Sequence, residues 1–226
     1  EAGFLAGIAA ALETKTGKVG FIGGMKSESI EKFGYGYVAG VAYANKHFGT
    51  NAEVVDYLYN GTFTDVAGGQ AQAGSMYDKG IDIIFTAAGR VGSGVITEAK
   101  TRTEAGDKVY VIGVDVDQYE DGIYNQETNE SVILTSALKR VDNASYTKVD
   151  EFINGTFTGG EVITMTAEVD GVGLPETNPN LTTETQETVN ELLANIKAGN
   201  LVIPSTEADV QSFLSEMGYQ GAKINF

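Results

Sequence analysis

Residues 110–118, YVIGVDVDQ, decide the fold of this chain. They belong to an unbroken apolar run, 109–114, that leads directly into two carboxylates, Asp115 and Asp117. Such a run is typical of a strand buried on both faces, as in a parallel sheet covered by helices. Ligands of open α/β sheets bind beyond the carboxyl ends of the strands, where these acids can accept hydrogen bonds from hydroxyl groups. A strand end that simply returns to solvent explains the two acids equally well at this point.

Strand and helix patterns alternate along the chain around this stretch. Because single helices and short loops separate the strands, the pattern predicts a parallel sheet with right-handed crossovers. The predicted strands of the first half are 18–22, 53–59, 81–87 and 108–114, and its predicted helices are 3–14, 28–47, 65–79 and 92–105. The second half is predicted to contain strands 131–136 and 161–169 and helices 138–153, 183–198 and 206–217.

The composition is that of an ordinary globular protein. The chain has 226 residues, of which 42% are hydrophobic and 20% are charged, and this length suffices for one large domain or two small ones. The formal net charge is −16, from 31 acidic and 15 basic side chains. Nucleic acid is therefore not expected as a partner, because phosphate binding needs a basic surface. The same charge disfavours an anionic membrane surface.

The sequence offers little material for catalysis or metal binding. Cysteine is absent, which excludes disulfides, thiolate metal sites and cysteine nucleophiles. The single histidine, His47, cannot form a multi-histidine metal site, and it is predicted near a helix end, where a cation complements the helix dipole. No apolar run reaches the roughly 18–20 residues that a membrane span needs.

Two glycine-containing loops follow predicted strands and offer backbone N–H groups to a ligand. The loop 87–95, AAGRVGSGV, contains Gly89 and opens a helix, whose N-terminus is suited to oxygen-rich ligands. The loop is similar to a dinucleotide-binding fingerprint, but Thr97 occupies the position of its last glycine, so a Rossmann-type oxidoreductase is a less favoured alternative. The second loop, with Gly24 and Met25, carries no Walker sequence.

Two further side chains are candidates for ligand contact. Phe33, near the start of helix 28–47, is either a core residue or an aromatic that faces the cleft. Lys139 is predicted to open a helix, where a cation is unfavourable for the dipole, and is either a snorkelling surface charge or a functional residue. Asp115 and Asp117 follow one another at the strand end, and their side chains are expected on opposite faces, with one of them in the cleft. They form a poor acid–base pair, and binding explains them better than catalysis.

Short motifs along nearly the whole chain carry a family likeness. In order, they are 1–7 (EAGFLAG), 18–24 (KVGFIGG), 33–37 (FGYGY), 87–89 (AAG), 111–118 (VIGVDVDQ), 139–142 (KRVD) and 171–174 (GVGL), then a late helix ending at Gly199 and Ile203-Pro204. Together they resemble the basic-membrane-protein family of bacterial ABC-transporter substrate-binding lipoproteins, of the purine nucleoside receptor A type. The likeness rests on the ordered set and not on any single motif.

The resemblance implies a periplasmic-binding-protein type I fold of the α/β class, in which two doubly wound parallel-sheet lobes close on a nucleoside about a hinge. It implies that Asp115 holds the ribose hydroxyls together with Lys139, which is expected to come from across the hinge. It also implies that backbone near Gly89 assists and that Phe33 stacks on the base. The candidate ligand-binding set is completed by Gly24, Met25 and Asp117. No cofactor and no catalytic residue is implied.

The resemblance also divides the chain into parts. Residues 18–117 are expected to form a complete lobe, 1–17 and 131–160 to be remnants of an incomplete N-terminal lobe, and 118–130 to be the hinge or linker. The lobe assignment of 161–226 stays open. Because the first strands of the N-terminal lobe are absent, we expect exposed apolar faces that self-associate or pair with the missing N-terminal segment.

The expected function is solute binding for a bacterial ABC importer, without enzymatic activity. A purine nucleoside, or a related ribose-bearing solute, would be bound between the lobes and delivered to a membrane permease. The full-length protein is expected to be extracytoplasmic and lipid-anchored at the cell membrane, although this chain has no signal peptide or lipidated cysteine. A sensor or effector-binding domain of the same fold is the alternative, and an appended DNA-binding segment would distinguish it.

Overall fold

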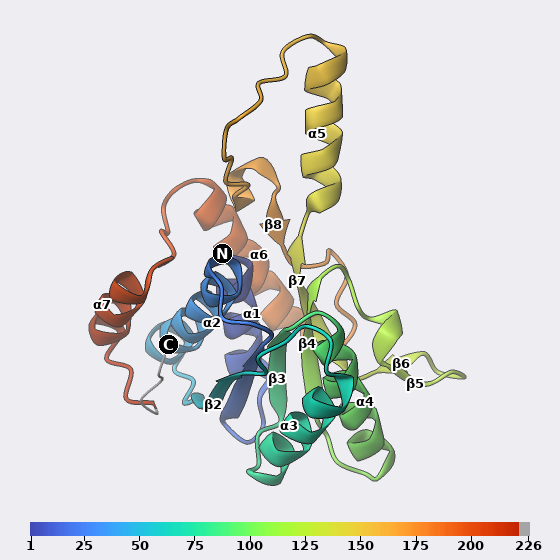
Figure 1. The fold of residues 1–226 in the computed structure, drawn as a ribbon. Coiled ribbons are helices and arrows are strands. Elements are labelled where there is room, and N and C mark those ends of the chain that lie inside the picture. The colour runs from blue at the N-terminus through green and yellow to red at the C-terminus, as the bar shows by residue number, and fades with distance from the viewer. Residues whose placement is uncertain (222–226) are drawn as a thin grey trace.

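A six-stranded sheet is the centre of the computed structural model, which describes residues 1–221 (Figure 1). Its strand order is β2-β1-β3-β4-β7-β8. All neighbouring strands are parallel except β7 and β8, which pair antiparallel. The strands are β1 (Lys18–Gly23), β2 (Glu53–Tyr59), β3 (Ile83–Ala87), β4 (Tyr110–Asp115), β7 (Ile133–Lys139) and β8 (Val172–Gly173).

Helices cover both faces of the sheet, as the alternating pattern predicts. Phe21 and Phe85 point into a core shared with one helix layer, whereas Ile22 and Ile84 point into a second core on the opposite face, because successive strand side chains alternate. The first layer comprises α1 (Ala2–Glu13), α2 (Glu28–Phe48), α6 (Thr183–Lys197) and α7 (Glu207–Met217). The second comprises α3 (Val66–Asp78) and α4 (Arg90–Glu104).

Glycines bring α1 and α2 into backbone contact. A Cβ atom on Gly7 would lie 2.1 Å from the carbonyl oxygen of Tyr37, and one on Gly40 would lie 2.2 Å from that of Phe4. Only glycine fits at such distances. These small residues of α2 therefore serve helix–helix packing. Gly34 differs from them, because it makes room for the Tyr57 hydroxyl.

The N-terminal helix and β7 belong to the same lobe as residues 18–117. β7 pairs in parallel with β4, with Leu138 opposite Asp115, and every apolar residue of α1 except Leu12 is buried. The assignment of 1–17 and of 131–139 to remnants of another lobe is therefore wrong. A buried parallel strand has the same apolar pattern in either lobe, so the sequence alone does not identify its neighbours.

The helix α5 (Val141–Ile153) projects away from this lobe (Figure 1). None of its residues is buried. Its exposed apolar side chains include Tyr146, Val149, Phe152 and Ile153. A helix of this length is marginal in water unless it packs against something. Of the predicted remnant 131–160, the strand β7 is largely buried in the sheet, whereas α5 and residues 154–160 contain no buried residue.

Two predictions for the later chain are also wrong. Residues 118–130 do not connect two lobes, because they leave β4 and return to β7 in the same sheet through η1 (Glu120–Gly122), β5 (Ile123–Asn125) and β6 (Glu130–Ser131). Residues 161–169 form no strand: they run without a ladder partner into η2 (Ala167–Val169). An alternating pattern needs a neighbouring strand to become a sheet, and the fully exposed Val162 has none.

The remaining predicted elements are present. Helices 183–198 and 206–217 correspond to α6 and α7, within one residue at each end. Residues 222–226 of the predicted C-terminal segment lie outside the described residues. Within the described part of the chain, no helix combines the length and the apolar character that crossing a bilayer requires.

Candidate ligand-binding site

Asp115 and Lys139 meet at the carboxyl ends of two adjacent strands. Asp115 is the last residue of β4, and its register partner in β7 is Leu138. Lys139 is the next residue and the last of β7. The Lys139 Nζ lies 3.1 Å from the Asp115 Oδ1, and the side chains are 50% and 48% exposed. The structure thus brings these two predicted residues together from one sheet and not from across a hinge. An exposed pair of this kind contributes at most about 1 kcal/mol to folding, so it is free to serve a ligand.

The backbone at Asp115 makes an abrupt turn. Its φ angle is +69°, and the Val116 N–H donates to the Val114 carbonyl across it at 2.9 Å. This is a γ-turn with a positive φ, a rare and strained conformation. Residues two apart on a strand share a face, and β4 in any case ends at Asp115, so the prediction that Asp115 and Asp117 lie on opposite faces is wrong. Asp117 is exposed, and its Oδ1 accepts a hydrogen bond from the Tyr119 N–H at 3.0 Å.

Gly89 opens α4 at the neighbouring strand end. Its φ and ψ angles are +57° and −129°, a combination that residues with a Cβ atom avoid. The residue is exposed, and its N–H has no hydrogen-bond partner within residues 1–221. A free N–H at a helix N-terminus suits an oxygen atom of a ligand.

The loop after β1 is more constrained. The Gly24 N–H donates to the Ala87 carbonyl at 3.0 Å, and its own carbonyl accepts from the Gly61 N–H at 2.9 Å. These backbone groups are engaged within the protein and hold the loop ends together. Met25, by contrast, exposes about half of its surface, 48%.

Phe63 is an aromatic at this edge that the sequence analysis missed. A Cβ atom on Gly24 would lie 2.3 Å from the Phe63 ring, so the ring packs directly over this glycine. The Phe63 carbonyl accepts from the Arg90 N–H at 2.9 Å, which ties the ring to the start of α4. Phe63 belongs to 60–64 (NGTFT), which follows a predicted strand, but the Asn-Gly dipeptide of this segment is typical of a turn and gives no sign of a ligand contact.

Phe33, near the start of α2, is partly buried. Its ring packs edge-on against Phe85, with centroids 6.0 Å apart, and it is partly buried against the core of α1 and α2. Within residues 1–221, no hydrogen bond, ion pair or ring contact joins Phe33 to Asp115 or Lys139. The structure supports its interpretation as a core residue.

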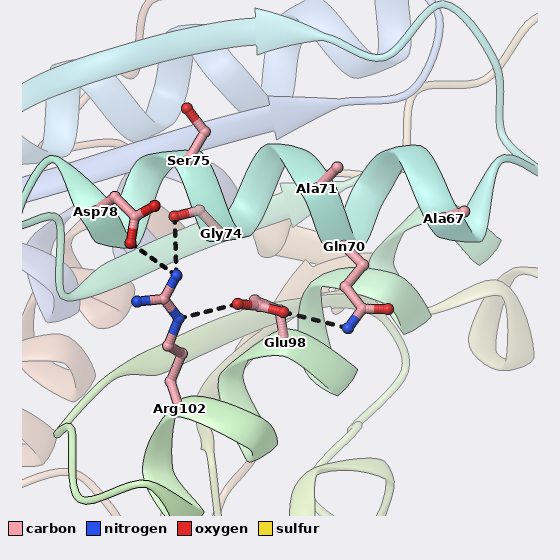
Figure 2. A pocket seen from close by; sticks show the side chains of 8 residues that line it. All are labelled: Ala67, Gln70, Ala71, Gly74, Ser75, Asp78, Glu98 and Arg102. Atoms are coloured by element: carbon pink, nitrogen blue, oxygen red, sulfur yellow. Dashed lines mark hydrogen bonds and ion pairs between the residues drawn. The ribbon is translucent and has the colours of Figure 1, made fainter.

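A hollow lies elsewhere on the surface, between α3 and α4 (Figure 2). Its volume is about 510 Å³. Arg102 donates to Glu98 at 2.9 Å and to Asp78 at 2.8 Å, and both bonds raise the pKa of the guanidinium. Gln70 donates to the same Glu98 at 3.2 Å. Because these polar groups satisfy one another, the hollow offers few free groups to a ligand.

Metal binding has no structural basis in the described part of the chain. No three His, Asp or Glu side chains there are grouped so that they could hold an ion. The groups that converge at one edge of the sheet are instead a carboxylate, an ammonium, a backbone N–H and an aromatic ring. These groups are chemically suited to hydroxyl groups and to a flat apolar ring. The strand order, the two helix layers and this edge define the lobe of a periplasmic-binding-protein-type solute-binding protein.

The chain belongs to the Bmp family, described as ABC transporter substrate-binding protein PnrA-like, whose model matches residues 1–207. It is 39% identical over 211 residues to the ABC transporter nucleoside-binding protein BmpA of Lactococcus lactis, covering 91% of this chain and 58% of that protein. It is 38% identical over 221 residues to basic membrane protein D of Borreliella burgdorferi, covering 96% and 60%. The chain therefore spans somewhat more than half of these relatives.

A solved structure agrees with this assignment. An ABC transporter solute-binding protein from Aeropyrum pernix matches with a TM-score of 0.78 and 26% identity, over 96% of this chain and 68% of the other. The family is one of solute-binding proteins of ABC transporters and not of enzymes. The predicted family and fold class are confirmed.

Proposed function

We propose that the protein containing this chain binds a purine nucleoside, or a related ribose-bearing solute, for an ABC importer. The Asp115–Lys139 pair at the strand ends carries the proposal. A carboxylate accepts and an ammonium donates, so together they match two neighbouring hydroxyl groups of a ribose. Hydrogen bonds to charged groups are about twice as strong as neutral ones. The Gly89 N–H supplies one further donor at the same edge.

For the base, we propose Phe63 as the stacking residue in place of Phe33. The Phe63 ring lies over Gly24 and beside Gly89, at the edge that holds the Asp115–Lys139 pair. Phe33 makes an edge-on contact with Phe85 and packs partly against the core. Stacking of a base on an aromatic side chain contributes about 1–3 kcal/mol in nucleic-acid-binding proteins. Met25, exposed in the loop after β1, completes the proposed apolar part of the site.

The proposal extends to partners and location. The Lactococcus lactis relative is named a nucleoside-binding protein of an ABC transporter, which supports a nucleoside ligand and delivery to a membrane permease. We propose that the whole protein acts outside the cytoplasm, lipid-anchored at the membrane, with a second lobe closing over the strand ends. We also propose that the exposed apolar side chains of α5 are covered by another part of that protein or by a second copy.

Titration calorimetry with purine nucleosides tests the site in the full-length protein. Asp115→Asn removes the charge but tolerates the positive φ, and Lys139→Met removes the ammonium. We expect each to weaken binding by about 10- to 100-fold, the loss that a hydrogen bond to a charged group entails. Asp107→Asn, an exposed change just before β4 begins, is the control and should bind as the wild type does. Unchanged affinity in both site variants would refute the assignment.

A further inference from the structure

The sheet opens next to Asp115. The pairing of β3 with β4 ends at Phe85 and Ile112, whereas the pairing of β4 with β7 continues to Asp115. Beyond Ile112, β4 therefore has a ladder partner on one side only. The Val114 N–H donates instead to the side-chain Oε1 of Gln118 at 3.0 Å. The Gln118 amide thus takes the place of a strand at the end of β4.

Gln118 is itself held on three sides. Its backbone N–H donates to the Oγ of Ser136, a fully buried residue of β7, at 3.0 Å, and its Nε2 donates to the Asp121 carboxylate at 3.1 Å. On the third side lies Gly113, where a Cβ atom would come within 2.7 Å of the Gln118 Oε1 and 2.8 Å of the Ser136 Oγ. A larger residue at position 113 would displace this arrangement.

The bonds of Gln118 lie on both sides of the strained turn. One holds Val114, just before Asp115, and the other fixes the chain three residues after Asp115 to the neighbouring strand. A strained conformation persists only where its surroundings enforce it. We propose that Gln118 is a positioning residue: it holds Asp115 in the turn that aims its carboxylate at the ligand beside Lys139. This inference rests on the proposed function of Asp115.

The test combines two substitutions in the full-length protein, with titration calorimetry against a purine nucleoside. Gln118→Met keeps the approximate shape of the side chain but loses the side-chain hydrogen bonds to the Val114 N–H and to Asp121, while the backbone bond to Ser136 remains. We expect about a tenfold loss of affinity, comparable with one hydrogen bond. In an Asp115→Ala background, the same substitution should cause no further loss, because residues that act as one unit are not additive. Gln126→Met, at an exposed hairpin position, is the matched control and should bind as the wild type does.

A second measurement needs no ligand. Amide hydrogen exchange at Val114 should be slow in the wild type and faster in Gln118→Met, since that N–H loses its acceptor. Wild-type affinity in Gln118→Met, or an equal loss in the presence and absence of Asp115, would overturn the inference while the nucleoside site stands. A wild-type protein that binds no nucleoside but shows the exchange difference would overturn the proposed function, and with it the role assigned to Gln118.

Discussion

Asp115 performs its proposed task from a conformation that favours glycine. Its φ of +69° lies in the left-handed region, which costs a residue with a Cβ atom about 1–3 kcal/mol. Two other non-glycine residues of the described chain, Asn129 and Asp170, share a positive φ. Asn129 lies in the hairpin turn and Asp170 forms an ion pair with Lys197. At Asp115, the proposed role of the carboxylate beside Lys139 in ligand binding explains why a strained backbone is retained.

The strain at Asp115 can be measured by substitution. We expect Asp115→Gly to stabilise the fold by about 1 kcal/mol, because the relief of strain exceeds the added flexibility of the unfolded chain. Nucleoside binding should be lost at the same time. Asp115→Ala is the matched control: it also lacks the carboxylate but keeps the strain, so it should be less stable than Asp115→Gly. Urea unfolding of the three proteins measures this order, and equal stability of the Gly and Ala variants would contradict it.

The contacts and backbone conformations of single residues were the least predictable from the sequence. The strand end and the predicted helix start made Asp115 and Lys139 candidates, and the resemblance gave them a shared role. Their contact follows from two strands whose adjacency the sequence did not specify. The turn after Val114 depends on Gln118, three residues beyond Asp115, and no local pattern predicts it. Phe63 was missed because the Asn-Gly dipeptide before it already explained a turn.

At the scale of elements, the contact of α1 with α2 is closest where both helices carry glycine. Gly3 and Gly7 of α1 face the carbonyl oxygens of Phe33 and Tyr37, at distances that leave no room for a methyl group. Backbone atoms cannot swing aside as a side chain can. The two helices would therefore have to move apart to accept any larger residue, and the core beneath them would open.

We expect Gly7→Ala to destabilise the protein by about 1–3 kcal/mol, the usual cost of overpacking a core. The gain in helix propensity, about 1 kcal/mol, offsets only part of this. The matched control is Gly74→Ala in α3, where the nearest atom to the new methyl group is a carboxylate oxygen of Glu98 at 3.2 Å, on a movable side chain. Thermal unfolding compares the two. A Gly7→Ala protein as stable as Gly74→Ala would contradict the packing described for α1 and α2.

Most elements were predictable because their patterns are local. The helical spacing of α2 and the apolar runs of β3 and β4 leave few alternatives. The wrong predictions concern which segments pair with one another. They are the neighbour of β7, the return of 118–130 to the same sheet, and the strand at 161–169, which has no neighbouring strand. Pairing between distant segments is a property of the whole fold, and a single segment does not encode it.

Over the whole molecule, buried tyrosines distinguish the folded from the unfolded chain. Burial raises the pKa of Tyr35 and of Tyr219 to about 12. Burial also raises the pKa of Tyr57, Tyr77 and Tyr37, in each case well above the usual value. Tyr57 stacks on Phe21, with ring centroids 4.6 Å apart, within the core. The neutral phenol is therefore the form that the folded state holds.

We expect the stability to fall as the pH rises from about 10 to 12. Below the unfolded pKa of about 10, both states keep their phenol protons and the stabilisation is complete. Above it, only the unfolded chain releases them, and each such tyrosine then costs about 1.4 kcal/mol per pH unit. Tyr57→Phe, which keeps the ring, should make this slope shallower by one tyrosine. Urea unfolding at several pH values measures the slope, and a flat profile over this range would contradict the burial of these phenols.

The strand β7 leads almost directly into the projecting helix α5. Lys139 ends β7 and Val141 begins α5. One residue, Arg140, therefore separates Lys139 from the helix that projects away from the lobe. β7, the strand that ends at Lys139, pairs with β4 on one side and with β8 on the other. With the proposed function, a ligand held by Lys139 would lie one residue from the start of α5.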